Sequence, residues 1–327
     1  MRLKKPGPPG FLGVLLLYRP SRTYLLNEKR MLMHRFATIT KNASNPAYKG
    51  ARLGVDRLAR ERNVEIIHRS PATPDDVDQQ IGLLEEMIDL RPDAVLLAPA
   101  HLHALGDVLA KLEAEDIPII MFVSKTAVGS PRCFIGSNDY QMTFDVGVEV
   151  CKQLAPGSKV VILDGNPLGI NYHDRGSGFR DAVRTFDGIE VVDREDGFFL
   201  KEPGKQAMLN IMDRTPHFDA VLAVNDFMVE GAIEALEGKG LRPLIGSVNA
   251  TPAGAALVKS GKMLTTAAFN AMAMGCMALE AAIRLMEGRA LPREVILPTE
   301  LVTQENAEEW MLDYDRRPLP RWNDYVT

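Results

Sequence analysis

Polar side chains recur where short apolar runs of this chain end. The run from Ala220 to Val224 stops at Asn225, and Lys41 and Asn45 follow the first run of the chain. Further polar residues at such positions are Asn42, Ser124, Lys125, Asp164, Asn166, Asp226, Asn249 and Asn270. An asparagine amide offers two donors and two acceptor lone pairs, which suits neutral hydroxyl groups. Since ligands of open parallel sheets bind beyond the carboxyl ends of the strands, these residues predict a site for a polar small molecule.

Each of these residues has a second interpretation, because Asn and Asp are also favoured helix N-caps. For Asp226 we favour capping of the helix that follows. For Asn45, Asn225 and Asn249 we favour contact with a ligand, since all three stand at predicted strand ends.

Motifs for common chemistries are missing from the sequence. It has no GxGxxG before a helix, no GxxxxGK[ST] and no GxSxG. The pair His101-x-His103 lacks a third ligand, so we expect no metal site. No nucleophile, base and orienting group can be assembled. These absences argue against an enzyme, and we expect no cofactor.

The elements that position these residues follow an alternating pattern. We predict strands at 36–39, 64–67, 94–98, 117–123, 133–135, 160–163, 190–192, 220–224, 244–248 and 265–269. We predict helices at 48–60, 75–89, 103–113, 140–154, 176–185, 205–212, 228–237, 253–259 and 272–286. Such alternation indicates an α/β fold with parallel strands covered on both faces. Because the strands are too many for one open sheet of usual size, we expect two doubly wound lobes.

Composition is that of a globular protein with one large or two medium domains, at 327 residues, 46% hydrophobic and 25% charged. The net charge of -5 gives no basic footprint, so we expect no nucleic-acid partner. Cys133, Cys151 and Cys276 are too widely spaced for a disulfide framework or a CxxC metal site. We interpret them as small buried hydrophobic residues.

The first residues form a separate segment, 1–34. It has a basic start and a short apolar run from Phe11 to Tyr18, which is loosely like a secretory signal. The run is far below the roughly 20 residues that span a bilayer. We expect a leader or degenerate signal and a periplasmic mature chain. A start at Met31 or Met33, an ordered N-terminal element and a cytoplasmic location remain alternatives.

Several segments, in order, match the pattern of one family. They are SNPAYKGARLGV (44–55), LLEEMIDLRPDAVLLAPA (83–100), HDRGSGFRDAV (173–183), AVNDFMVEGAIEAL (223–236), IGSVNATP (245–252) and SGKMLTTAAFNAMAMGCMALEAA (260–282). From about Phe36 to Val302 the chain resembles the type I periplasmic sugar-binding proteins. These are the ribose-binding-like solute receptors of ABC transporters, and they share their fold with LacI-type sensor domains.

The resemblance implies two lobes joined by a hinge of three crossovers, near 136–139, 269–270 and 297–299. The N-terminal lobe would comprise 35–137 plus 270–297. The C-terminal lobe would comprise 138–269 plus 298–315, and 316–327 would form a tail.

The resemblance also implies a ligand pocket between the lobes. Asn45 would bond a hydroxyl group, Tyr48 would stack on a sugar face opposite Phe199, and Arg175 would donate to ligand oxygens. The amide of Asn225 would point into the cleft. The ligand-binding residues that we predict are Lys41, Asn45, Tyr48, Ser124, Asn171, Arg175, Phe199, Asn225, Asn249 and Phe269.

The chain departs from the family pattern at several of these positions. Val123-Ser124 stand where Asp-Arg is common, Phe269 stands where Gln is usual, and Lys41 replaces a small polar residue. Asn249 stands where Asp is common. A pocket that keeps its cations and loses carboxylates favours an anionic or highly polar ligand. We therefore expect a sugar acid, a polyol or a modified sugar, and whether Lys41 faces the ligand stays open.

The expected function is that of a solute-binding receptor of an ABC-type carbohydrate importer. It would clamp its ligand by hinge closure, act as a monomer, dock on a transporter permease and have no membrane-inserted segment in the mature chain. The alternative is a receptor that passes a signal to a partner protein. A transcription regulator would need a helix-turn-helix before Phe36, and the Pro- and Gly-containing start shows no such pattern.

Overall fold

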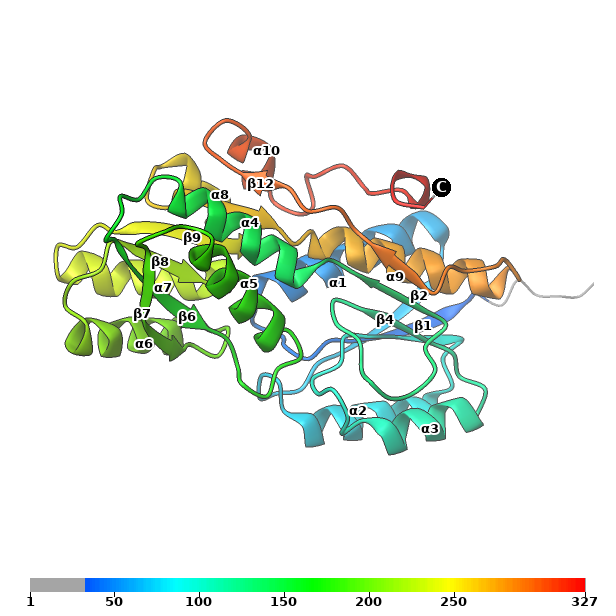
Figure 1. The fold of residues 1–327 in the computed structure, drawn as a ribbon. Coiled ribbons are helices and arrows are strands. Elements are labelled where there is room, and N and C mark those ends of the chain that lie inside the picture. The colour runs from blue at the N-terminus through cyan, green and yellow to red at the C-terminus, as the bar shows by residue number, and fades with distance from the viewer. Residues whose placement is uncertain (1–32, 327) are drawn as a thin grey trace, which may run out of the picture. The chain divides into compact units, whose positions relative to one another are not determined.

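The computed structural model describes residues 33–326, and the chain from His34 onward forms one compact unit (Figure 1). The predicted leader, 1–34, lies almost wholly outside the described residues. Two six-stranded sheets organise the described unit. No helix among the described residues is long and apolar enough to cross a membrane.

The sheet of the N-terminal lobe is parallel throughout. In spatial order its strands are β11 (Glu294–Ile296), β5 (Cys133–Gly136), β4 (Ile119–Phe122), β3 (Ala94–Leu97), β1 (Arg35–Ile39) and β2 (Glu65–Arg69). β3 and β4 are fully buried apolar runs, as is typical of strands covered on both faces.

The sheet of the C-terminal lobe is parallel except for one edge strand. Its spatial order is β12 (Leu301–Val302), β10 (Thr265–Ala268), β9 (Leu244–Asn249), β8 (Ala220–Ala223), β6 (Lys159–Asp164) and β7 (Glu190–Asp196). β12 pairs antiparallel with β10, because the chain returns to this lobe through a short connection rather than a helix.

Helices cover both sheets. In the N-terminal lobe they are α1 (Pro46–Arg62), α2 (Val77–Leu90), α3 (Gly106–Ala114) and α9 (Ala271–Met286). In the C-terminal lobe they are α4 (Asp139–Cys151), α5 (Tyr172–Arg184), α6 (Lys201–Arg214), α7 (Asp226–Gly238), α8 (Pro252–Lys259) and α10 (Ala307–Met311). A 3-10 turn, Trp322–Asp324, lies near the end of the chain.

The helices of the N-terminal lobe divide between the two faces of its sheet. Figure 1 shows α2 and α3 on one side and α1 and α9 on the other. α1 and α9 approach closely because each presents a glycine at their crossing. A Cβ on Gly54 would lie 2.3 Å from the carbonyl oxygen of Met272, and one on Gly275 would lie 2.1 Å from that of Ala51. Any larger residue at these positions would force the helices apart.

The chain passes between the two sheets three times. It leaves the N-terminal sheet after β5 and enters the C-terminal lobe at α4, and it returns between β10 and α9. The third passage lies between β11 and β12. The prediction of two doubly wound lobes joined by three crossovers is therefore confirmed.

Every predicted strand and helix forms, with shifted ends. The sequence analysis missed β11, β12 and α10, which have three, two and five residues. Elements this short show no measurable hydrophobic periodicity. All three cysteines are free and buried, as the sequence analysis expected.

The last part of the chain packs on both lobes. α10 contacts α8 of the C-terminal lobe. Arg57 of α1 donates from Nη1 to the carbonyl oxygens of Tyr314 at 2.7 Å and Arg317 at 2.8 Å. Trp322 is buried, with the guanidinium of Arg284 from α9 lying 4.7 Å from its ring centre. This segment therefore ties α1 and α9 to α8.

Candidate ligand-binding site

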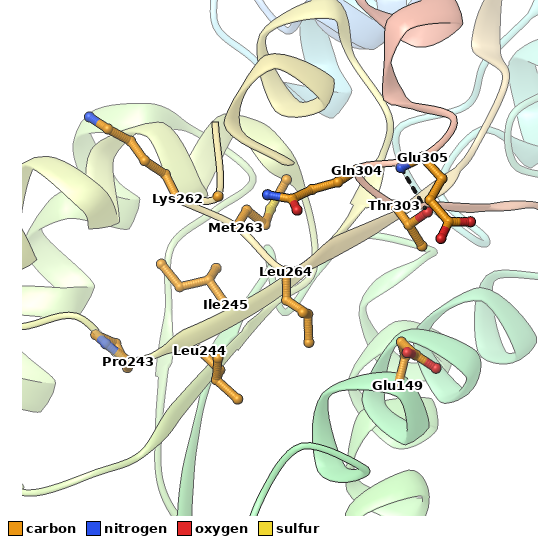
Figure 2. Close-up of a pocket in the computed structure, with 11 residues that line it drawn as sticks. Glu149, Pro243, Leu244, Ile245, Lys262, Met263, Leu264, Thr303, Gln304 and Glu305 are labelled. Carbon is orange, nitrogen blue, oxygen red and sulfur yellow. Dashed lines mark hydrogen bonds between the residues drawn. The ribbon is translucent and has the colours of Figure 1, made fainter. Parts of the chain in front are cut away.

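A groove of about 450 Å³ lies at the amino ends of β9 and β10. Figure 2 shows Lys262 and Glu149 at opposite sides of it. Its charged side chains are exposed or half-buried and do not converge on a common point. Because parallel sheets bind ligands at the opposite ends of their strands, this groove is the weaker candidate.

A smaller cavity, of about 30 Å³, lies at the carboxyl ends of the strands, between the two sheets. The residues that line it are Lys41, Asn42, Asn45, Ala47, Tyr48, Asp75, Val123, Asn171, Arg175, Phe199, Asn225, Asn249 and Phe269. The structure thus brings together all the predicted ligand-binding residues except Ser124. Their contact with a ligand stays a prediction.

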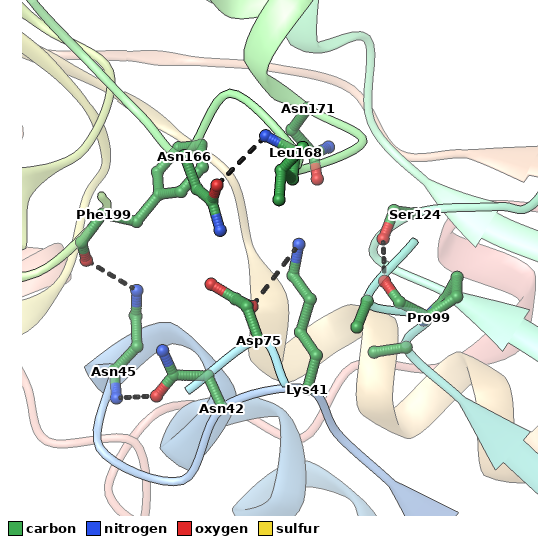
Figure 3. A network of polar contacts seen from close by, with 12 residues as sticks. Lys41, Asn42, Asn45, Asp75, Pro99, Ser124, Asn166, Leu168, Asn171 and Phe199 are labelled. Atoms are coloured by element: carbon green, nitrogen blue, oxygen red, sulfur yellow. Dashed lines mark hydrogen bonds and ion pairs between the residues drawn. The ribbon is translucent and has the colours of Figure 1, made fainter. Parts of the chain in front are cut away.

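Ser124 does not line this cavity, although it is buried. Its hydroxyl donates to the carbonyl oxygen of Pro99 at 3.4 Å (Figure 3). The preceding residue, Val123, lines the cavity instead and has a positive φ of 70°. This left-handed conformation turns the chain sharply after β4 and directs the Ser124 hydroxyl toward the neighbouring loop.

Asn45 and Asn225 each cap a helix and also reach a common acceptor. The Oδ1 of Asn45 accepts from the Ala47 amide at 3.0 Å, and that of Asn225 accepts from the Met228 amide at 2.9 Å. Their Nδ2 atoms donate to the carbonyl oxygen of Phe199, at 3.5 Å and 3.0 Å (Figure 3 shows the Asn45 bond). Since Asn45 belongs to the N-terminal lobe and Phe199 to the C-terminal lobe, one of these bonds joins the lobes.

The prediction that Asp226 caps α7 is wrong. Asn225 takes the cap position in an extended conformation, with φ -162°, and Asp226 is the first residue of the helix. The buried carboxylate of Asp226 accepts instead from the Thr251 amide at 2.8 Å and the Thr266 hydroxyl at 2.7 Å. Burial raises the pKa of Asp226 to about 6. Asp226 therefore ties the ends of β8, β9 and β10 together beneath the site.

Arg175 is the most heavily bonded cation in the cavity. Its Nε donates to Asp139 at 2.6 Å, and its Nη1 donates to the Val224 carbonyl at 2.7 Å and to Oδ1 of Asn249 at 3.1 Å. The guanidinium also lies 4.7 Å from the ring centre of Phe269. Arg175 thus connects α5, α4 and the ends of β8 and β9 at the hinge.

Asn171 completes this cluster, since its amide donates to the other carboxylate oxygen of Asp139. Asn171 precedes α5 but makes no side-chain cap hydrogen bond, so its side chain is committed to Asp139. Asp139 was missed by sequence analysis. Its position as the first residue of α4, directly after the first crossover, was the available signal.

Lys41 is buried and lines the cavity rather than pointing to solvent, and its contact with a ligand stays a prediction. Its Nζ lies 3.9 Å from Oδ1 of Asp75, and both side chains are at least nine-tenths buried. Burial raises the pKa of Asp75, and the Lys41 ammonium opposes that rise. The sequence analysis overlooked two carboxylates that balance these cations: Asp75 lines the cavity, and Asp139, which does not line it, pairs with Arg175.

Asp75 escaped notice in the sequence because a loop separates it from β2. We placed it at the start of a helix, whereas the helix begins at Val77, capped by Asp76. Asp75 and Asp76 are adjacent, and only one residue can be the N-cap of a helix. This was a signal that the other carboxylate makes a different contact.

Aromatic rings enter the cavity from both lobes. Tyr48 comes from the first turn of α1, and burial raises the pKa of its hydroxyl. Phe199 comes from the loop after β7, with φ 59°. Its ring lies on Gly165, where a Cβ would be 2.0 Å from the ring. Glycine at that position therefore lets the Phe199 ring approach the loop after β6 closely.

Among the described residues, no group of three or more His, Cys, Asp or Glu side chains could hold a metal ion. The charged side chains of the cavity pair with one another. The site offers amide, hydroxyl, ammonium and carboxylate groups together with aromatic rings, a composition suited to a polyhydroxylated molecule.

Known proteins are similar to this chain over most of its length. The model of the periplasmic binding protein domain family matches residues 36–290. The ribose import binding protein of Bacillus subtilis is 25% identical over 262 residues, covering 80% of this chain and 85% of the relative. The xylitol-binding protein of Mycolicibacterium smegmatis is 24% identical over 267 residues, covering 78% and 73%.

A solved structure is similar over most of its length. It is an ABC transporter solute-binding protein from Bacillus halodurans with bound myo-inositol, with a TM-score of 0.79 and 26% identity. The match covers 85% of this chain and 97% of that one.

Proposed function

Because this chain belongs to the periplasmic binding protein domain family, we propose that it is a solute-binding receptor that captures a sugar or polyol between its two lobes. The observation that carries the proposal is the cavity at the hinge. Amides, charged groups and aromatic rings converge there from both lobes, at the carboxyl ends of both sheets.

The size of the cavity requires a conformational change for binding. A volume of about 30 Å³ holds roughly two water molecules, far less than a sugar ring. The lobes, or the side chains between them, move apart to admit the ligand, and the three crossovers serve as the hinge. Ligand that contacts both lobes stabilises the closed form through its greater affinity for that form.

The receptor works with a transporter rather than as an enzyme. Similar proteins include a ribose import protein and an ABC transporter solute-binding protein. This chain accordingly delivers its ligand to the permease of an ABC importer, acts in the periplasm and functions as a monomer. The charged groups that line its cavity bind and orient the ligand, and no reaction is assigned to them.

A thermal-shift screen of purified protein tests the proposal. Sugars, polyols and sugar acids are added separately, and a compound that binds only the folded state raises the melting temperature. We expect a shift with at least one compound class. Small molecules released from the denatured protein are identified in parallel by mass spectrometry. No shift and no released carbohydrate would refute the proposed function.

A further inference from the structure

The two ion pairs of the cavity differ in how completely their groups are bonded. Arg175 and Asp139 form a close pair at 2.6 Å. Nη1 of Arg175 also donates to the Val224 carbonyl oxygen and to Oδ1 of Asn249. Lys41 and Asp75 stand 3.9 Å apart, beyond hydrogen-bond distance. Oδ1 of Asp75 is buried and has no hydrogen-bond partner among the described residues. The Lys41–Asp75 pair therefore keeps bonding capacity for a ligand.

The backbone fixes the Lys41–Asp75 pair in this open geometry. The Asp75 amide donates to the Lys41 carbonyl oxygen at 2.8 Å, so the two residues are held side by side. Asp75 also adopts a left-handed conformation, with φ 60°. Strained backbone of this kind occurs where the surrounding structure holds a side chain in place, often at binding sites.

We propose that Lys41 and Asp75 together form a subsite for one hydroxyl group of a neutral sugar or polyol. A hydroxyl oxygen placed about 2.8 Å from each atom fits between groups 3.9 Å apart. It accepts a hydrogen bond from the ammonium of Lys41 and donates one to Oδ1 of Asp75. Among residues 33–326 no group bonds that carboxylate oxygen, so the hydroxyl completes a buried network.

The same pair discriminates against charged ligands. A ligand carboxylate here would meet Asp75, and a ligand ammonium would meet Lys41, with little water to screen either repulsion. A deoxy analogue would leave both protein groups unpaired, which a site built to bond a hydroxyl penalises strongly. Because Asp139 already balances Arg175, the cavity holds no surplus positive charge for a sugar acid. The ligand class is thereby narrowed to neutral polyhydroxy compounds.

Titration calorimetry on the full chain tests this inference, which rests on the proposed function. The neutral probes are D-ribose, xylitol and myo-inositol, the acids are D-gluconate and D-glucuronate, and the amine is D-glucosamine. We expect at least one neutral compound to bind tenfold or more tightly than every acid and the amine. An acid or amine bound as tightly as any neutral compound overturns the inference and leaves the receptor function standing. Absence of binding by all probes, with no carbohydrate released on denaturation, overturns both.

Two variants test the pair directly. Asp75→Asn keeps the shape and tolerates the left-handed backbone, but it leaves the Lys41 charge unbalanced. It should raise the ratio of acid to neutral affinity at least tenfold. Lys41→Met leaves Asp75 unbalanced and should raise the ratio of amine to neutral affinity by a similar factor. Unchanged ratios in both variants overturn the inference.

A matched pair on the same lobe supplies the control. Lys125 and Glu294 form an exposed ion pair that does not line the cavity. Lys125→Met and Glu294→Gln make the same charge changes and should leave all affinity ratios within twofold of wild type. A change in these controls equal to that in the cavity variants would attribute the effect to overall charge and overturn the proposed subsite.

Discussion

Replacing Arg175 by methionine should destabilise the protein strongly, even though Arg175 lines the cavity at the hinge. The side chain is 4% exposed and Asp139 is 8% exposed, so the change leaves a buried carboxylate without its cation. Removal of one partner from a buried ion pair typically costs about 3–5 kcal/mol. The Val224 carbonyl and the Asn249 amide oxygen also lose a donor, but such losses overlap with the first. We expect the free energy of unfolding to fall by about 3–5 kcal/mol.

The assay is urea unfolding of ligand-free Arg175→Met protein near pH 7, followed by circular dichroism. Ligand must be removed first, because bound ligand would raise the stability of wild type and not of a variant that binds poorly. Methionine preserves most of the side-chain volume, so the measurement isolates charge and hydrogen bonding. In the double variant with Asp139→Asn, no buried charge is left unpaired. The double variant should therefore recover about 2 kcal/mol relative to Arg175→Met.

Arg184→Met supplies the control on the same helix. Arg184 pairs with Asp181 at the surface, where its side chain is 73% exposed. Its loss should cost less than about 1 kcal/mol. If Arg175→Met is as mild as Arg184→Met, the Arg175–Asp139 pair does not hold the hinge region together and the reasoning fails.

Three further predictions concern the framework. Asp226, with its pKa raised to about 6, binds a proton in the folded state at pH values where the unfolded chain has lost it. The free energy of unfolding should therefore fall by about 3 kcal/mol as pH rises from about 4 to above 6, and Asp226→Asn should remove this fall. Identical profiles of melting temperature against pH for wild type and Asp226→Asn would contradict the raised pKa of Asp226. Gly275→Ala should lower the free energy of unfolding in urea by about 1–3 kcal/mol, because its Cβ meets the Ala51 carbonyl oxygen. The control Gly238→Ala, with open space around it, should not lower it. Equal stabilities of the two variants would refute the close helix crossing. Trp322→Ala should cost about 3 kcal/mol in the same assay, and a loss below about 0.5 kcal/mol would show that the end of the chain does not pack on α9.

The fold could be predicted because its pattern is repeated along the chain. Runs such as 94–97 and 220–223 are wholly apolar and alternate with amphipathic helices, so fold class follows from periodicity alone. The short strands β11 and β12 could not be found this way. They form because the sheet edges offer them partners, and that information is tertiary.

The sequence could predict which residues line the candidate site, but not which ion pairs those residues form. Lys41 and Arg175 were found because strand ends and family segments marked them. Their partners were not, because Asp75 and Asp139 belong to the connections before α2 and at the first crossover. Whether a cation is paired depends on where a second segment of chain brings its carboxylate. This is why the sequence pointed to an anionic or highly polar ligand, whereas the structure pairs each cation with a carboxylate, the observation on which our proposal of a neutral ligand rests.

A crystal structure of the protein with the tightest-binding compound tests the central claim most directly. The account predicts ligand density between Tyr48 and Phe199, with one hydroxyl within hydrogen-bond distance of both Lys41 and Asp75. Ligand density in the groove at the amino ends of β9 and β10, or on an outer surface of either lobe, would contradict it.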